Sequence, residues 1–451
     1  MSSFRECFHL VLGIVALLAY CPMGRAQARP LPGKDVNAIY DRLLPQIEKI
    51  PIVDMHAHPG YWDDTDVDAM AVTVTELDPA RTRPTNAEWA AAAKALFGYP
   101  YNDLSPEHAK WLDQKDDELR KQWGKDYLTK ILDKVGIQVS VANRVAMDYL
   151  ENNPRFRFVF FVDPYMFPFD NSKLAISPDR AVYFPIQEKA LHRYLEQVGQ
   201  SGLPADFAGY EAAMHRKLEM DKQNGAVALK FEAPYFRSLV NIKDPPREEA
   251  EAIYNKYHAG GVPTAKEYLV FQDYIFRSLI AQAGPLHLEV HIHSAVGSGN
   301  YYHLSEGNAM DLENILRDPR YKDTTFVMIH GGFPYTAQSI WLAALPNVFL
   351  DTSEFNTLIY PAQYSRILKE WFEIFPEKIV FGSDCFPYSR EVGVPETYWL
   401  AVQTGRTAAA AALAEMVSEG EINEERAMEI ARGYLHDNTA RLFGIETLAK
   451  H

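Results

Sequence analysis

Two histidines separated by one residue, His56 and His58, stand where an apolar stretch of the sequence ends. In a β-strand, residues i and i+2 point to the same face about 6.5 Å apart, so two imidazoles can converge on one ion. One such pair is weak evidence, because ordinary core or surface histidines also occur at this spacing. A second pair stands at His291 and His293. The chemistry indicated is divalent-metal binding, provided that other ligands lie nearby.

Further side chains that suit metal or proton chemistry close other short apolar runs. Lys230, His330 and Asp384 each stand at such a position. Carboxylates and imidazoles bind divalent metals, and a lysine beside a metal changes its charge state readily. An aspartate after Gly-Ser is also a common helix cap. The residues that close the apolar runs are therefore stronger evidence for a metal site as a set than any one of them is alone.

These residues need a scaffold that gathers the ends of several strands. Eight runs rich in β-branched and aromatic residues alternate with longer stretches of helical periodicity. The predicted strands are residues 50–55, 136–142, 157–162, 226–230, 286–293, 325–330, 347–351 and 378–384. Such an alternation favours the α/β class, and eight units predict a (β/α)8 TIM barrel, whose catalytic groups lie at the C-terminal ends of the strands. An open doubly wound sheet is the alternative.

Two insertions exceed what a plain barrel needs. Residues 59–103 would form an elaborated first βα loop, and loops of this length are usually lids, binding loops or small subdomains. Residues 167–225 are expected to hold two helices, and helices are also expected C-terminal to the eighth strand, at 397–418, 423–432 and 435–442. Because no internal repeat or low-complexity segment interrupts this pattern, residues 29–451 are predicted to form one barrel domain.

The N-terminus predicts export. Residues 10–20 form an apolar run too short to span a bilayer, and Ala26-Gln27-Ala28 follows with the small-x-small pattern of a signal-peptidase site. We therefore expect a signal peptide at residues 1–28, a periplasmic or secreted location and no stable membrane span after cleavage. A retained N-terminal anchor and a lipoprotein attached at Cys21 are the alternatives. Cleavage would leave Cys385 as the one cysteine, so no internal disulfide is expected.

Composition excludes some partners. The 451 residues include 45 Lys and Arg against 60 Asp and Glu, which gives a net charge of −15. Nucleic-acid binding needs a basic face that displaces counterions, so this balance disfavours it. A small-molecule substrate is the expected partner.

In order and spacing, the residues that close the runs resemble the amidohydrolase superfamily. The similarity is greatest to its amidohydrolase-related branch, which includes nodulin-like domains, and it spans roughly residues 50–445. The motifs that carry it are His56-Ala57-His58, Leu229-Lys230, Ile329-His330-Gly331-Gly332 and Phe381-Gly382-Ser383-Asp384. The resemblance implies a TIM barrel and a metal bound by the following residues: His56, His58, His293 and Asp384. Periodicity alone leaves His291 as an alternative to His293.

The resemblance also implies catalytic roles and a cofactor. Asp384 would transfer a proton, and His330 and Lys230 would act as acid, base or electrostatic groups. One Zn²⁺ is the expected cofactor, while carboxylated Lys230 bridging a second metal is the alternative. Barrels of this kind often self-associate, so a homo-oligomer is compatible with the family.

Several residues in predicted loops are candidates for substrate binding. These are Tyr235, Arg237, Tyr302 and His303. Arg237 would suit a carboxylate, because its planar fork can pair both oxygens. A packing or solvated role is the alternative for each of the four.

The predicted activity is metal-dependent hydrolysis of an amide, lactone or related carbonyl compound by an activated water molecule. The same site would also serve a non-oxidative decarboxylase acting on a carboxylic acid. A non-catalytic binding barrel is the third hypothesis, and it predicts missing ligands, whereas every expected position is filled.

Overall fold

The computed structural model describes residues 35–68, 79–175, 181–294, 296–297 and 302–448. Within these ranges, no helix combines the length and the hydropathy that crossing a membrane would require. The predicted signal peptide at residues 1–28 lies outside the described residues, so export stays a prediction.

Eight parallel strands form one sheet in chain order. They are β1 (Ile52–Ala57), β2 (Ile137–Asn143), β3 (Phe156–Phe161), β4 (Ala226–Phe231), β5 (Glu289–His293), β6 (Phe326–Ile329), β7 (Val348–Asp351) and β8 (Ile379–Val380). The chain after β8 returns to β1, where Met55 N donates to Phe381 O and Asp384 N donates to His56 O, both at 2.8 Å. The sheet therefore closes into a TIM barrel, as predicted, and the open doubly wound alternative is wrong.

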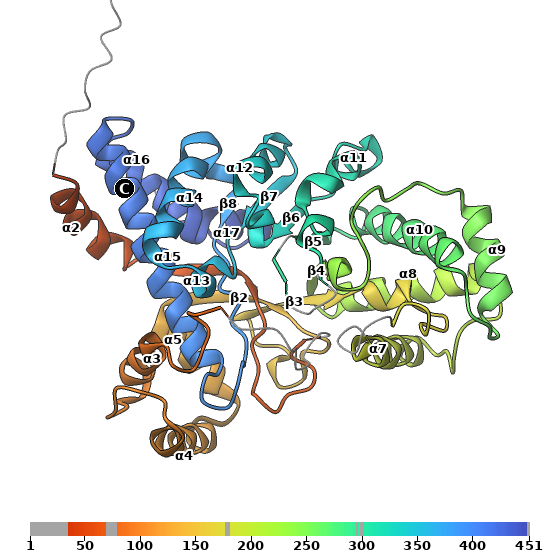
Figure 1. Cartoon of the computed structure of the whole chain (residues 1–451), viewed down its shortest axis with the longest axis horizontal. Helices are drawn as coiled ribbons and strands as arrows, with labels where there is room; N and C mark the ends of the chain where they lie inside the picture. The colour runs from red at the N-terminus through yellow and green to blue at the C-terminus, as the bar shows by residue number, and fades with distance from the viewer. Residues whose placement is uncertain (1–34, 69–78, 176–180, 295, 298–301, 449–451) are drawn as a thin grey trace, which may run out of the picture.

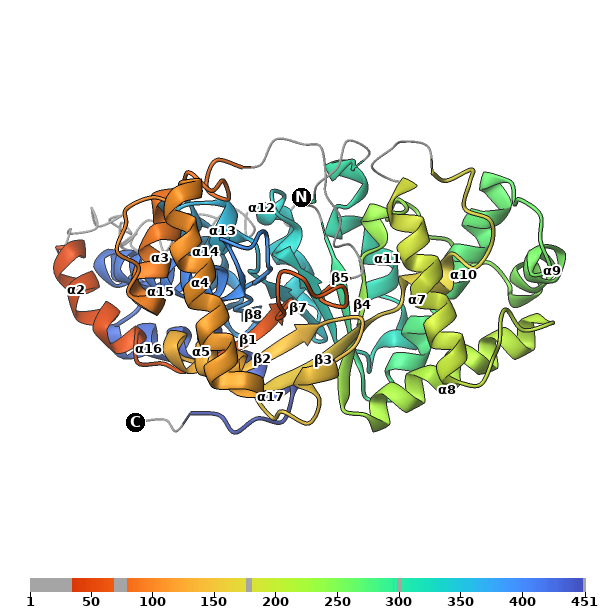
Figure 2. The ribbon, with the colours of Figure 1, turned by 90° about the horizontal axis from the view of Figure 1, so that it is seen from below.

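Helices surround this barrel (Figure 1). They are α2 (Val36–Ile47), α3 (Ala87–Phe97), α4 (Pro106–Trp123), α5 (Tyr127–Val135), α7 (Tyr183–Gln197), α8 (Phe207–Gln223), α9 (Arg247–Tyr257), α10 (Ala265–Ala283), α11 (Glu313–Leu316), α12 (Thr336–Ser339), α13 (Phe355–Leu358), α14 (Pro361–Ile374), α15 (Val394–Glu419), α16 (Glu424–Arg432) and α17 (Asn438–Leu442). In both ribbon views, α7 to α10 lie on one side of the barrel and α2, α3 and α15 lie on the other (Figures 1 and 2).

Both predicted insertions are present. The first βα connection is elaborated by α3, α4 and α5, and residues 167–225 hold α7 and α8. The predicted C-terminal helices correspond to α15, α16 and α17. The barrel interior is filled by apolar side chains, among them Met55, Val327, Ile329 and Val380. This packing fixes the strand ends that carry the polar residues.

Two predicted strands differ at their ends. The fifth begins at Glu289 rather than at residue 286, because residues 284–287 form a turn in which His287 has a φ of 52°. His287 is exposed there and lies outside the strand. The eighth ends at Val380, because the chain bends where Asp384 adopts a φ of 49°.

Glu289 places a titratable carboxyl group at the N-terminal end of β5. Its side chain is buried, and its Oε2 lies 3.3 Å from His291 Nε2. Burial raises the pKa of Glu289 to about 8 and lowers the pKa of His291 to about 3. The folded protein therefore holds a proton on Glu289 that the unfolded chain releases near its ordinary pKa of about 4.3.

Replacing Glu289 with glutamine should remove this pH dependence. A carboxyl group with a raised folded-state pKa stabilises the fold at low pH and loses that contribution as pH rises toward the raised value. Relative to E289Q, the wild type should lose on the order of 1 kcal/mol per pH unit between pH 5 and 8. Urea unfolding at several pH values measures this, with E118Q as control, because the Glu118 side chain is 70% exposed. Parallel pH profiles for wild type and E289Q would contradict it.

Candidate metal centre

Three predicted ligands converge where β1 meets the end of β8. His56 Nε2 lies 3.3 Å from His58 Nε2 and 3.2 Å from Asp384 Oδ1, and His58 Nε2 lies 3.7 Å from that oxygen. Ligand atoms bonded tetrahedrally at roughly 2.0–2.2 Å lie about 3.3–3.6 Å apart. The three atoms therefore match one face of a coordination tetrahedron, and the residues present fit a divalent metal.

Local backbone structure explains why these side chains meet. His56 lies in β1 and His58 follows directly after it, so both project from the same face of the extended chain. Asp384 enters from the other side, with a left-handed φ of 49° fixed by its N–H, which donates to His56 O at 2.8 Å. The main-chain closure of the barrel thus also positions the carboxylate.

Two buried carboxylates support the ligands. Asp68 Oδ2 lies 3.1 Å from His58 Nδ1, which orients the ring and leaves Nε2 for a metal. Asp54 Oδ1 accepts from Ser383 N at 2.7 Å, and Asp54 Oδ2 accepts from Ser383 Oγ at 2.8 Å. Asp54 therefore ties β1 to the residue immediately before Asp384. Burial raises the pKa of Asp54 to about 8, although the serine hydrogen bonds oppose this shift.

Replacing Asp68 with asparagine should weaken metal binding without unfolding the protein. The partner of a metal-bound histidine typically contributes about 10-fold to 100-fold to metal affinity. Competition with a chelator measures the Zn²⁺ dissociation constant of D68N. D133N is the matched control, because the Asp133 side chain is 61% exposed and pairs with Arg155 on the surface. Equal affinities in D68N and D133N would contradict the orienting role of Asp68.

Lys230 lies beside this centre. Its side chain is buried, and its Nζ is 3.4 Å from His56 Nε2. An ammonium group offers donors only, so it can stabilise negative charge that develops near His56. Lys230 also contributes to a lowered pKa of His56, although burial is the larger cause.

A second group of potential ligands shares Asp384. It consists of His330, Glu354 and Asp384, whose ligand atoms lie within 4.8 Å of one another. His330 has a φ of 61° after β6, and Glu354 has a φ of 68° after β7. Burial raises the pKa of Glu354 well above its ordinary value and lowers that of His330 well below it. Burial thus favours the protonated carboxyl of Glu354 and the neutral imidazole of His330.

The fifth-strand histidines point to different partners. His291 is buried beside Glu289. His293 lies nearer the metal centre, with ring centroids 4.6 Å from His330 and 4.8 Å from Tyr235. However, His293 Nε2 hydrogen-bonds to Val296 O at 2.5 Å, and His293 belongs to neither ligand group. Its role as a metal ligand stays a prediction.

The four predicted substrate-binding residues separate into two sets. Tyr235 and Tyr302 lie together beside His293, with 5.1 Å between the two tyrosine rings. Arg237 instead donates from Nη2 to Asp273 Oδ1 at 2.7 Å, in a pair that is almost fully buried. Nε and Nη2 of Arg237 are thus engaged within the protein, whereas Nη1 is buried without a hydrogen-bond partner among the described residues. Substrate binding by Arg237 stays a prediction. His303 is exposed and belongs to neither ligand group found among the described residues.

Sequence reasoning missed several buried carboxyl groups around the centre. Besides Asp54, Asp68 and Glu354, they include Glu232, whose Oε2 is buried without a hydrogen-bond partner. Burial, with Asp68 as a second cause, raises the pKa of Glu232 well above its ordinary value. A usable signal existed for Glu232 and Glu354, because each stands two or three residues beyond the end of a predicted strand.

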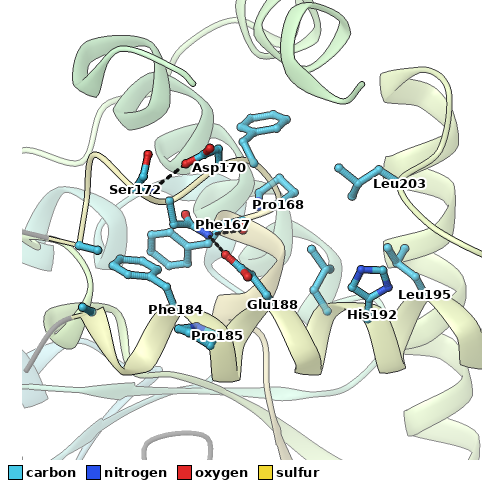
Figure 3. A pocket seen from close by; sticks show the side chains of 15 residues that line it. Phe167, Pro168, Asp170, Ser172, Phe184, Pro185, Glu188, His192, Leu195 and Leu203 are labelled. Atoms are coloured by element: carbon cyan, nitrogen blue, oxygen red, sulfur yellow. Dashed lines mark hydrogen bonds between the residues drawn. The ribbon is translucent and has the colours of Figure 1, made fainter. Parts of the chain in front are cut away.

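A pocket elsewhere on the molecule is separate from this chemistry. It has a volume of about 580 Å³ and lies between α7 and residues 167–175 (Figure 3). Its carboxylates already have partners, since Asp170 accepts from Ser172 N at 2.8 Å and Glu188 accepts from Asn171 Nδ2 at 3.1 Å. Its lining includes no member of either ligand group.

The closed barrel and the converging ligand atoms are compatible with a metal-dependent hydrolase or a related enzyme. The family model described as "Amidohydrolase" matches residues 225–445. This match supports the amidohydrolase-related branch that the sequence predicted. The predicted recognition is thereby confirmed, and with it the expectation of an enzyme.

One curated relative and several solved structures are similar to the chain. Protein fluG of Emericella nidulans is 30% identical over 154 residues, which cover 34% of this chain and 17% of that protein. The uronate isomerase of Bacillus halodurans aligns with a TM-score of 0.58 at 14% identity, over 92% of this chain and 98% of that chain. A protein of Lactobacillus casei assigned as a metal-dependent hydrolase aligns with a TM-score of 0.53 at 15% identity, over 89% and 97% of the two chains. At these identities, the solved structures support the fold alone.

Proposed function

We propose that the chain hydrolyses a carbonyl compound, an amide, lactone or related ester, with one Zn²⁺ held by His56, His58 and Asp384. The observation that carries the proposal is the triangle of ligand atoms, 3.2 to 3.7 Å on a side, at the mouth of a closed barrel. His293 is proposed as a further ligand, which would require its ring to release Val296 O. A bound divalent metal supplies Lewis acidity and lowers the pKa of a water molecule toward about 7.

The chain's own residues supply the remaining steps. Asp384 can accept a proton from the attacking water and pass it to the leaving group, because its carboxylate lies at the centre and its side chain remains 14% exposed. Lys230 donates hydrogen bonds to the oxygen that becomes negative as the carbonyl is attacked. Tyr235 and Tyr302 form an aromatic wall beside His293, which would contact the body of the substrate.

A turnover screen in ¹⁸O-labelled water tests the proposal. Zinc-loaded protein is offered amides, lactones and aromatic carboxylic acids, and products are analysed by mass spectrometry. Hydrolysis predicts one ¹⁸O atom in the product acid. Release of carbon dioxide from an acid, with no ¹⁸O in the remaining product, would replace the proposal with the decarboxylase. Isomerisation without ¹⁸O incorporation would likewise contradict it.

A further inference from the structure

The network around His330 fixes which of its two ring nitrogens carries the proton. His330 Nδ1 lies 3.0 Å from Ser353 Oγ, 3.4 Å from Ser353 O and 3.6 Å from Glu354 Oε2. A backbone carbonyl can only accept a hydrogen bond, so Nδ1 must donate if it bonds to that oxygen. The position of the serine hydroxyl proton decides whether Ser353 Oγ agrees.

The contacts of Asp351 show which atom receives the hydroxyl proton of Ser353. Asp351 Oδ2 accepts backbone N–H groups from His330 at 3.2 Å and from Ser353 at 3.1 Å, so this oxygen acts as an acceptor. Ser353 Oγ donates its proton to the same Oδ2. The serine oxygen is then left to accept from His330 Nδ1. Both hydrogen-bond partners of Nδ1, Ser353 Oγ and Ser353 O, therefore accept from it.

The other nitrogen faces a different environment. No described residue forms a hydrogen bond with His330 Nε2, and the His330 ring packs edge-on against His56 at 5.5 Å and His293 at 4.6 Å. A neutral ring protonated at Nδ1 carries its lone pair at Nε2.

We infer that Asp351 and Ser353 are positioning residues that hold His330 as the Nδ1–H tautomer, so that Nε2 accepts a hydrogen bond from the reacting molecule. The group opposite Nε2 is therefore a donor, such as a water molecule, a hydroxyl or an amine, rather than a carbonyl or carboxylate oxygen. His330 thus orients that donor through a hydrogen bond, while Asp384 carries the transferred proton and Lys230 polarises the carbonyl. The catalytic part of this inference rests on the proposed hydrolysis, whereas the tautomer does not.

The tautomer is measured by NMR on zinc-loaded protein labelled with ¹⁵N in its histidine rings. The signals of His330 are those missing from the spectrum of H330Q. The expected pattern has a protonated Nδ1 and an unprotonated Nε2. Because the measurement needs no substrate, it can succeed even if the screen reveals no hydrolysis. A protonated Nε2 in the wild type would overturn the inference.

A matched pair of serine variants tests whether the Ser353 hydroxyl positions His330. S353A removes the hydroxyl acceptor, and the His330 signals should move toward averaged positions for the two tautomers. S365A is the control, because Ser365 is a buried serine on α14 whose Oγ bonds to Ala362 O at 3.2 Å. Its His330 signals should match the wild type. An unchanged tautomer in S353A would show that the Ser353 hydroxyl does not position His330.

Discussion

Replacing His58 with alanine should abolish metal binding and turnover together. His58 supplies one of the three converging ligand atoms, and its Nδ1 is held by Asp68 at 3.1 Å. Loss of the carboxylate that orients a metal-bound histidine costs about 10-fold to 100-fold in metal affinity. Loss of the histidine itself should therefore lower the metal affinity by more than about 100-fold. Metal content by atomic emission should fall from one equivalent to near zero, and activity should fall to background.

H215A is the matched control for that variant. His215 is an exposed histidine on α8 whose Nδ1 hydrogen-bonds to Gln282 Oε1 at 2.9 Å. It belongs to neither ligand group. It should retain full metal content and activity. Thermal unfolding of both metal-free variants separates a lost ligand from a lost fold. An H58A protein that is folded, metal-free and still active would show that the chemistry lies elsewhere.

Replacing Gly382 with alanine should cause the largest loss of stability among small substitutions near the site. A β-carbon at this position would overlap Asp351 Oδ1 and would lie 2.8 Å from Ser353 Cβ. Overpacking in a closed core typically costs about 1–3 kcal/mol, and this overlap involves a fully buried carboxyl group that also binds His330 N and Ser353 N. We expect a loss of about 3 kcal/mol or more in the free energy of unfolding.

Denaturant titration of the metal-free protein measures this effect. G202A serves as the control, because a β-carbon on Gly202 meets no atom within 4 Å. It should change stability by less than about 0.5 kcal/mol. If G382A unfolds at the same denaturant concentration as G202A, the packing described at the end of β8 is wrong. Weaker metal binding in G382A would further show that the overlap is relieved by moving Asp384.

The barrel and the first ligand set could be predicted because their signals are local. Each strand is a short apolar run, and His56 and His58 owe their shared direction to strand alternation alone. Asp384 required an extra assumption, since β8 ends at Val380 and a left-handed residue rather than a continuing strand aims the carboxylate. The three side chains nevertheless converge, because barrel closure brings the two chain segments together.

The remaining features depend on contacts between distant segments. Arg237 looked available for a substrate carboxylate, but Asp273 on α10 pairs with it, and no sequence pattern links positions 36 residues apart. The Nδ1 partners of His330 come from the turn after β7, which periodicity does not describe. Likewise, the choice between His291 and His293 depends on which partner each ring finds, Glu289 or Val296.

The position of the metal tests the central claim most directly. Crystals of the zinc-loaded protein, measured on both sides of the zinc absorption edge, locate the ion by its anomalous signal. We predict one peak within bonding distance of His56 Nε2, His58 Nε2 and Asp384 Oδ1. A peak bound elsewhere, or no peak at these three atoms in fully loaded crystals, would contradict the proposed centre.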